Sequence, residues 1–248
     1  MDIWKYYDIT HKKHIVLNPM SIDKLDGLFS LLNLKPDLKI LDIGCGKGEF
    51  LIKLAELFNI SGIGVDISPY FLKDCKDNKN ERVPNSDIKF LEMDGAKYRP
   101  ETNELFDLTM CIGASFIYDG FMGTINALKK MTKPGGMIIS GEPYWLKEPD
   151  EEFLKISEIK KDDYNSHYKN IDIGEKEGLK CIYTLVSNQD DWDHYETLQW
   201  WSAYDYIDDN PDDSDNSELS RKIEKAKMQY LLYGRDTFGW AIYVFKRQ

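Results

Sequence analysis

Glycines and a carboxylate lie together early in the chain, in a pattern that suits the binding of a small ligand. Gly44, Gly46 and Gly48 occupy alternate positions directly after an apolar run that contains Asp42. Glycine adopts positive φ readily, and a helix that begins beside such a turn directs free N–H groups toward a ligand. Residues 40–49 are therefore predicted to form a strand, a tight turn that receives the ligand, and the start of a helix.

Two more carboxylates follow the next two predicted strands. Asp66 stands near the end of the second strand, where one carboxylate can accept hydrogen bonds from both hydroxyls of a ribose. Asp94 follows the third strand and is placed to accept from the exocyclic amine of adenine, while the aliphatic Ile67 is suited to cover an adenine face. A glycine loop alone is weak evidence. Loop ends in this order predict a ligand that contains adenosine.

Short apolar runs alternate with amphipathic runs, and these elements must position the loop ends. The predicted strands are residues 38–43, 61–67, 88–93, 106–112 and a fifth that begins at 137–140 and ends near 142–145. The predicted helices are residues 22–32, 48–59, 69–77 and 121–131, with a polar loop at 78–87 and a sharp turn at 133–136. This alternation indicates right-handed β-α-β units on a mainly parallel sheet, whose ligands bind outside the carboxyl ends of the strands.

The second half of the chain is predicted to be largely helical. Helices near 151–159 and 171–178, a strand at 179–187, a long helical stretch at 188–234 and a last strand at 237–245 follow one another. The long stretch has an aromatic segment, Trp192 to Tyr206, that we interpret as helix core or as a substrate cage. It continues with an acidic break at 208–215, expected to be a solvated loop, and a second helix at 217–233.

We interpret the chain as one domain. Its predicted parts are an N-terminal arm and helix (1–37, with residues 1–20 irregular or a short helix), a ligand-binding core (38–145) and two insertions that cover substrate (146–178 and 188–234).

Composition narrows the classes of partner. The chain has 248 residues, a net charge of −11 and a sequence pI of about 4.9, so its surface repels phosphate backbones and a nucleic-acid partner is not expected. No apolar run is long enough to span a membrane, and the N-terminus lacks the features of a secretory signal. Four widely spaced cysteines predict reduced thiols, a cytoplasmic location and no metal site. The sequence does not determine the oligomeric state.

Several of these segments together resemble the class I S-adenosylmethionine-dependent methyltransferases. The segments are residues 40–48, Asp66, residues 93–96, residues 106–107 and residues 133–136, and the similarity extends over about residues 20–145. Through residues 141–145 and 234–240, the whole chain also resembles a bacterial group of small methyltransferases of unassigned substrate.

The resemblance implies a fold, a cofactor and roles for named residues. The implied α/β fold is three-layered and Rossmann-like, with a seven-stranded, mostly parallel sheet whose last strand is antiparallel and follows a helical insertion. The implied cofactor is S-adenosylmethionine, with Asp42 and the Gly44–Gly48 turn at its methionine part, Asp66 at the ribose, and Asp94 with Ala96 at the adenine. The predicted cofactor-binding residues are Asp42, Gly44, Gly46, Gly48, Asp66, Ile67, Asp94, Gly95, Ala96, Ile112 and Gly113.

For the residues predicted to lie near the methyl acceptor, the sequence allows more than one role. Glu142 follows the fifth strand and is a candidate general base or acceptor-positioning group, or else a solvated or capping carboxylate. Tyr144 and Trp145 either line the acceptor pocket or pack under the insertion that follows. His11 either lies on an arm that closes over the cofactor or is an ordinary surface residue. Arg235 either binds an anionic substrate group or pairs with a nearby carboxylate.

The predicted function is methyl transfer from S-adenosylmethionine to a small-molecule acceptor. The cofactor is already activated, so the protein mainly orients the reactants and excludes water. A non-catalytic binder of the cofactor or of its demethylated product is the alternative. An NAD-dependent oxidoreductase is disfavoured by the G-x-G-x-G spacing and by Asp94.

Overall fold

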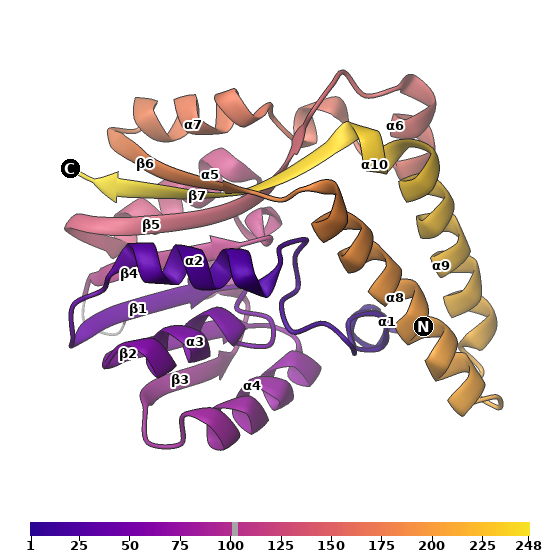
Figure 1. Cartoon of the computed structure of the whole chain (residues 1–248), viewed down its shortest axis with the longest axis horizontal. Coiled ribbons are helices and arrows are strands. Elements are labelled where there is room, and N and C mark those ends of the chain that lie inside the picture. Colours follow the sequence, from indigo (N-terminus) through magenta and orange to yellow (C-terminus); the bar gives the residue numbers. More distant parts are fainter. Residues whose placement is uncertain (101–103) are drawn as a thin grey trace.

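The computed structural model describes residues 1–100 and 104–248 and contains one seven-stranded sheet (Figure 1). The strands are β1 (Leu38–Ile43), β2 (Ile60–Asp66), β3 (Asp87–Glu92), β4 (Phe106–Ile112), β5 (Thr132–Trp145), β6 (Leu179–Val186) and β7 (Phe238–Arg247). Their order is β3-β2-β1-β4-β5-β7-β6, and β7 runs antiparallel to both of its neighbours. The neighbouring pairs among β1 to β5 are parallel. The predicted Rossmann-like fold with an antiparallel last strand is confirmed.

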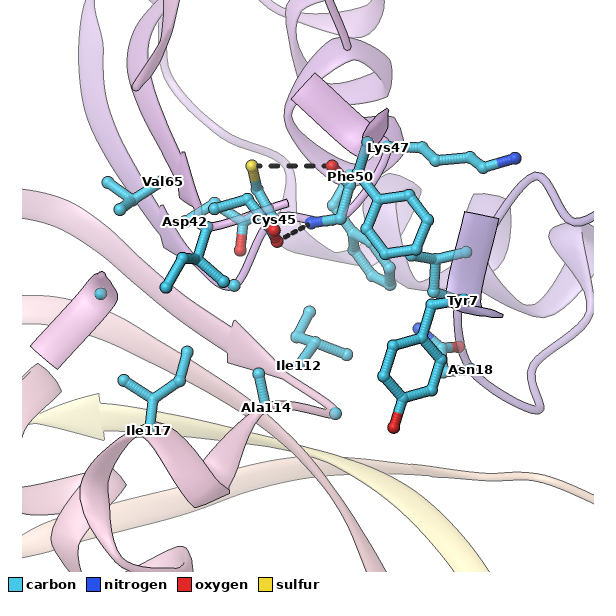
Figure 2. A pocket seen from close by; sticks show the side chains of 18 of the residues that line it. Tyr7, Asn18, Asp42, Cys45, Lys47, Phe50, Val65, Ile112, Ala114 and Ile117 are labelled. Atoms are coloured by element: carbon cyan, nitrogen blue, oxygen red, sulfur yellow. Dashed lines mark hydrogen bonds between the residues drawn. The ribbon is translucent and has the colours of Figure 1, made fainter. Parts of the chain in front are cut away.

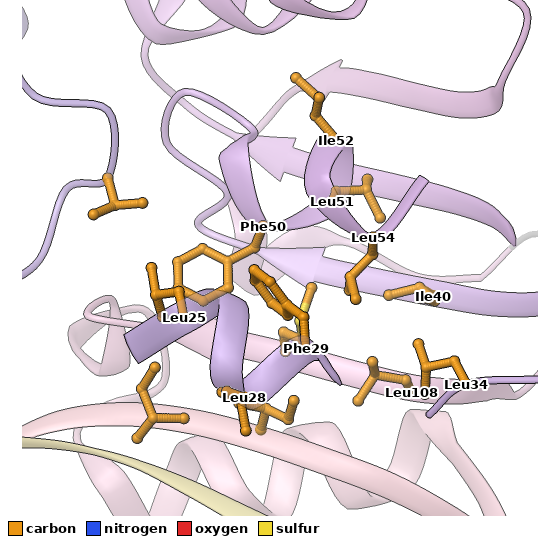
Figure 3. Close-up of a cluster of buried hydrophobic side chains, with 14 of the residues drawn as sticks. Leu25, Leu28, Phe29, Leu34, Ile40, Phe50, Leu51, Ile52, Leu54 and Leu108 are labelled. Carbon is orange, nitrogen blue, oxygen red and sulfur yellow. The ribbon is translucent and has the colours of Figure 1, made fainter. Parts of the chain in front are cut away.

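Helices cover both faces of the sheet. The longer ones are α1 (Ile3–Thr10), α2 (Ile22–Leu32), α3 (Glu49–Leu57), α4 (Pro69–Arg82), α5 (Phe121–Met131), α6 (Glu151–Ser157), α7 (His167–Lys176), α8 (Gln189–Asp209) and α9 (Asn216–Gln229). Buried leucines and phenylalanines of α2 and α3 pack on one face (Figure 3), and α5 and α7 pack on the other. Ile40 of β1 belongs to the first layer and Leu41 to the second, as alternation along a strand requires. Within the described residues, no helix is long and apolar enough to cross a membrane.

The structure extends α4 beyond its predicted end near residue 77. The helix continues to Arg82, through residues that the sequence predicted to be a polar loop. Arg82 Nη2 donates to Glu49 at 3.0 Å, and its Nε donates to Glu56 at 2.8 Å. Both carboxylates belong to α3, so ion pairs between the helices stabilise turns of α4 that lack an apolar face. The apolar periodicity of the α4 sequence does not predict these ion pairs with α3.

The predicted sharp turn at residues 133–136 lies inside β5 instead. Phe106 of β4 pairs with Thr132, but Leu108 pairs with Met137, so the residues between form a bulge in β5. Gly135 adopts a φ of 76° within this bulge. The proline and glycines of this segment therefore form an irregular part of β5, and not a turn that precedes the strand.

Among the helices of the second half, α7 packs on the sheet, whereas α8 and α9 stand beyond the carboxyl ends of the parallel strands (Figure 1). α8 and α9 lie side by side there, and α1 packs against α8 (Figure 1). A π-helical turn, η4 (Tyr230–Gly234), and the short α10 (Arg235–Thr237) lead from α9 back into β7. α1 is thus enclosed between the sheet and the late helices.

The acidic break is more than a solvated loop. Lys5 Nζ of α1 donates to Asp213 at 2.8 Å and to Asp215 at 2.6 Å. The ammonium of Met1 donates to Glu218 at 2.7 Å. The acidic segment therefore holds the N-terminal arm, residues 1–20, and its charge is used for docking as well as for solvation.

Candidate functional site

A cavity of about 790 Å³ lies at the carboxyl ends of the central strands (Figure 2). Of the predicted cofactor-binding residues, the cavity is lined by Asp42, Gly44, Gly46, Asp66, Ile67, Asp94, Gly95, Ala96, Ile112 and Gly113. Gly48 lies outside this lining and forms the N-cap of α3, with a φ of 77°. Because the fold brings these loop ends to one edge of the sheet, residues far apart in the sequence surround one space.

The glycines of the turn are required by its geometry. Gly44 and Gly46 adopt φ of 70° and 54°. A Cβ on Gly44 would lie 2.6 Å from the Cβ of Ala114, and a Cβ on Gly46 would lie 2.7 Å from Cδ1 of Leu17. A side chain at either position would therefore strain the backbone and displace a wall of the cavity. The N–H of Gly44 donates to the Val65 carbonyl at 2.8 Å, which fastens the turn to β2.

Asp66 holds the turn in place while it faces the cavity. Its Oδ2 accepts from the N–H of Gly46 at 2.8 Å, and its Oδ1 accepts from the N–H of Ser68 at 2.9 Å. Burial raises the pKa of Asp66, and these backbone hydrogen bonds oppose the rise. A carboxylate oxygen can accept more than one hydrogen bond. Asp66 therefore retains acceptor capacity for a ligand.

Asp42 lies on the floor of the cavity and is 2% exposed (Figure 2). Burial raises its pKa to about 8, and the charge of Asp66 adds to the effect. The carboxyl group is therefore substantially protonated at neutral pH and can donate a hydrogen bond as well as accept one. A cationic ligand group at this position would lower the pKa and restore the carboxylate.

Asp94 and Ile67 present an acceptor and an apolar surface. Asp94 Oδ1 accepts from the N–H of Ala96 at 2.9 Å, which caps the short helix η1 (Gly95–Lys97). Its Oδ2 lies 3.4 Å from Nζ of Lys97. Ile67 is 46% exposed. An exposed aliphatic side chain and a carboxylate in the lining of one cavity suit a planar heterocycle with an amino group.

The N-terminal arm forms the wall opposite the turn. Residues 15–18 of the arm line the cavity. Lys47 joins this arm to the glycine turn: its Nζ donates to the carbonyls of His11 at 2.9 Å, His14 at 3.2 Å and Lys12 at 3.4 Å. It also lies 3.4 Å from Oδ2 of Asp74, and Figure 2 shows its side chain directed away from the centre of the cavity. One buried cation thus satisfies several carbonyls just beyond the end of α1.

His11 and His14 fasten the arm to α8 through Tyr195. His14 Nε2 lies 2.9 Å from the carbonyl of Tyr195 and therefore carries the proton. His11 Nδ1 lies 3.2 Å from the carbonyl of Tyr7, so its Nε2 accepts from the Tyr195 hydroxyl at 3.0 Å. Burial lowers the pKa of His11 to about 3 and that of His14 to about 4, so both rings are neutral at physiological pH. His11 lines the cavity, but its nitrogens are engaged by the protein.

The cavity and the sheet have counterparts in known proteins. Residues 40–136 match the family described as a methyltransferase domain. The chain is 31% identical over 245 residues to the uncharacterized protein YjhP of Escherichia coli K12, a match that covers 98% of both chains. It is also similar to solved S-adenosylmethionine-dependent methyltransferases in complex with S-adenosylhomocysteine. The one from Thiobacillus denitrificans is 30% identical, with a TM-score of 0.91 and full coverage of both chains. The one from Geobacter sulfurreducens is 28% identical, with a TM-score of 0.92 and coverage of 100% and 99%.

The chain belongs to the class I S-adenosylmethionine-dependent methyltransferases. Its cofactor is S-adenosylmethionine. The residues present fit that cofactor, because the glycines keep clear the space that a Cβ would fill and Asp42, Asp66 and Asp94 offer hydrogen-bond partners. The predicted fold and cofactor of the methyltransferase are thereby confirmed.

Glu142 lies next to the cavity rather than in its lining. It is 2% exposed, and its Oε1 accepts from the Ser115 hydroxyl at 2.8 Å. Its Oε2 is buried and has no hydrogen bond to the described residues. Burial raises the pKa of Glu142 to about 7, and the Ser115 hydrogen bond opposes this rise. Ser115 begins the short helix η2 (Ser115–Tyr118), whose Phe116 and Ile117 line the cavity, so the methyltransferase has a direct link from Glu142 to that wall.

We expect Glu142→Gln and Glu142→Ala to separate a positioning role from a general base. Gln can still accept from Ser115, so Glu142→Gln should keep activity if Glu142 only holds η2, whereas Glu142→Ala and Ser115→Ala should both lower it by roughly tenfold, about 1.4 kcal/mol. Loss of activity in Glu142→Gln, with intact cofactor binding, would instead identify a base. Initial rates across pH 5.5–8.5 make this comparison.

The same variants have a predicted pH dependence of stability. The folded-state pKa of Glu142 is raised, so its contribution is most favourable below the unfolded value and is lost as pH rises through about 7. Glu142→Gln removes this titration. The free energy of unfolding of Glu142→Gln, measured in urea and taken relative to wild type, should therefore increase as the pH rises from 5 to 8. A constant difference between the two proteins across that range would contradict the pKa assignment.

Three predicted substrate-binding residues lie outside the cavity lining. Tyr144 is 7% exposed and packs on the ring of His167 with centroids 5.0 Å apart. Trp145 stacks on Phe238 at 4.5 Å. Arg235 makes a two-pronged ion pair with Asp193, with Nε–Oδ1 and Nη2–Oδ2 both at 2.9 Å. The aromatic pair packs where β5 meets β7, and Arg235 ties α10 to α8.

Several lining residues of the methyltransferase were not singled out from the sequence. They are Trp4, Tyr7, Val16, Leu17, Asn18, Phe71, Phe116, Ile117 and Tyr195. The sequence shows that the arm and α8 are rich in aromatic residues. It does not show that these residues meet at one cavity, because their meeting depends on the docking of α1 against a helix that lies nearly two hundred residues later.

Proposed function

We propose that this methyltransferase transfers the methyl group of S-adenosylmethionine to a small-molecule acceptor held under the N-terminal arm and α8. The observation that carries the proposal is the division of the cavity. Its sheet side presents the glycine turn and three carboxylates, whereas its outer side is formed by Trp4, Tyr7, Phe116 and Tyr195. A polar end for the cofactor and an aromatic end for an acceptor are what a methyl transfer between two bound molecules requires.

In this proposal, each cofactor-binding residue contacts S-adenosylmethionine through a side-chain or backbone group described above. Asp66 accepts from the ribose hydroxyls, and Asp94 with Ala96 recognises the adenine under Ile67. Asp42 and the Gly44–Gly46 turn hold the methionine part. S-adenosylmethionine supplies an activated methyl group, so the protein orients the acceptor and excludes water. The net charge of −11 supports a small molecule rather than a nucleic acid as acceptor.

The second helical insertion, residues 188–234, is proposed to cover the acceptor. Tyr195 of α8 lines the cavity and binds His11 of the arm, which supports this role. None of the residues lining the cavity comes from residues 146–178. We therefore propose that the later insertion and the arm together cover the acceptor.

Turnover with methyl-labelled S-adenosylmethionine tests the proposal. The protein should move label into pooled small metabolites and leave transfer RNA and DNA unlabelled. Calorimetry with S-adenosylhomocysteine and NAD in parallel should show binding of the first alone. Cofactor binding with no label transfer to any pool would favour a non-catalytic binder, and a preference for NAD would contradict the assignment of the cavity.

A further inference from the structure

Glu196 of α8 is a carboxylate without a partner among the described residues. Among the described residues, none makes a hydrogen bond or an ion pair with it. Trp192 and Trp200 lie four residues before and after it, and therefore on the same face of the helix. The indole Nε1 of each tryptophan is buried and has no hydrogen bond to the described residues. Carboxylate and indoles share one stripe of α8.

Aromatic rings from two further segments, η4 and α1, lie beside this stripe. The ring of Tyr230 lies 6.3 Å from that of Trp192 and 6.2 Å from that of Trp200. Tyr6 packs on the same apolar cluster as Trp200. Burial raises the pKa values of Tyr6, Tyr195 and Tyr230, and neighbouring charges that include Glu196 add to the rise. They stay neutral at physiological pH. Tyr6 belongs to α1, so the arm supplies part of this enclosure.

The cations near this enclosure have other partners. Lys222 pairs with Glu218 at 2.8 Å and lies over the ring of Tyr6. Lys227 lies over the ring of Trp200 at 5.5 Å. Arg235 pairs with Asp193. None of these cations makes an ion pair with Glu196 among the described residues, and burial raises the pKa of Glu196 to about 7.

The chemistry that would complete this enclosure is that of an organic cation. Glu196 is partly buried, and a partly buried carboxylate without a partner is stabilised by a cation beside it. Aromatic faces add attraction of roughly 0.5–2 kcal/mol for an ammonium group. An anion would meet repulsion from Glu196. The enclosure adjoins the cofactor cavity, because the ring of Trp192 lies 6.4 Å from that of Tyr195, which lines that cavity.

We propose that Glu196, with Trp192, Trp200, Tyr6 and Tyr230 around it, binds an amino or ammonium group of the methyl acceptor, so that the substrate is an organic amine. This inference rests on the proposed function for the identity of the ligand as acceptor. The cation site itself stands on the contacts of α8.

Two matched sets of probes test the cation site. Butylamine and butyltrimethylammonium are titrated into the protein saturated with S-adenosylhomocysteine, with butan-1-ol and butyrate as probes of similar length. Tryptophan fluorescence is the readout, because Trp192 and Trp200 flank the site. Both cations should give saturable responses and the other two probes none. Glu196→Gln should weaken cation binding at least tenfold, whereas Asp208→Asn, an exposed change of equal charge on the same helix, should not.

The outcomes separate this inference from the proposed function. No saturable cation response, equal binding of butyrate, or unchanged affinity in Glu196→Gln would overturn the amine site even if methyl transfer is found. Glu196→Gln should bind S-adenosylhomocysteine as wild type does, which also shows that the variant is folded. Absence of any label transfer, with selective cation binding retained, would overturn the acceptor role and leave the cation site. Label transfer to amines should fall in Glu196→Gln and persist in Asp208→Asn.

Discussion

Asp66→Ala is expected to weaken the binding of S-adenosylhomocysteine at least tenfold, about 1.4 kcal/mol. The proposed ribose contact is lost, and so are the hydrogen bonds that Asp66 accepts from the N–H groups of Gly46 and Ser68. The turn that receives the methionine part would therefore loosen at the same time. Because the two effects act on two parts of one ligand, the ribose and the amino-acid part, the loss should exceed that for removal of a single ribose contact. Calorimetric titration measures it.

Asp87→Ala is the matched control. Asp87 is an exposed carboxylate at the start of β3, so its removal changes net charge equally without touching the cavity. Its affinity for S-adenosylhomocysteine should equal that of wild type. Wild-type affinity in Asp66→Ala would show that the ribose has been placed wrongly. Methylthioadenosine, which lacks the amino-acid part, should also bind more weakly to Asp66→Ala.

Lys47→Met is expected to lower the free energy of unfolding by about 2–4 kcal/mol and to release the arm. Lys47 is 8% exposed and donates to carbonyls of His11, Lys12 and His14. Methionine keeps the apolar stem but leaves these carbonyls without their donor. Amide hydrogen exchange in residues 3–18 should accelerate by more than the change in global stability explains. Urea unfolding and exchange on the same samples provide both quantities.

Lys73→Met provides the comparison on a neighbouring surface. Lys73 pairs with Asp77 on α4 and its side chain is 76% exposed, so its loss should change stability by less than about 1 kcal/mol. Exchange in the arm should stay as in wild type. If Lys47→Met leaves arm exchange unchanged, the contacts of Lys47 do not hold the arm closed.

The first half of the fold could be predicted closely because its signals are local. Strand 38–43, strand 106–112 and helices 22–32 and 121–131 have the bounds read from the sequence. Most apolar positions in these segments are buried in the structure, so their periodicity predicts the elements directly. The carboxylates at the loop ends were predictable for the same reason, since parallel strands bring their carboxyl ends to one edge.

The features that sequence reading missed depend on partners far along the chain. The last turns of α4 are held by ion pairs between Arg82 and two carboxylates of α3. The acidic break pairs with Lys5, more than two hundred residues away. A charge pattern shows that such groups exist, but not which of them meet. The same limit applies to Tyr144, Trp145 and Arg235, whose residue types suit a substrate pocket and whose contacts in the structure are with other side chains.

The connection that Lys47 makes between the arm and the glycine turn has a kinetic consequence. The turn forms the inner wall of the cavity and the arm the outer one, so we expect S-adenosylhomocysteine to leave when the bonds between Lys47 and the arm carbonyls break. Release of the spent cofactor and opening of the acceptor side would then be one event, and the lifetime of the closed arm would set an upper bound on turnover.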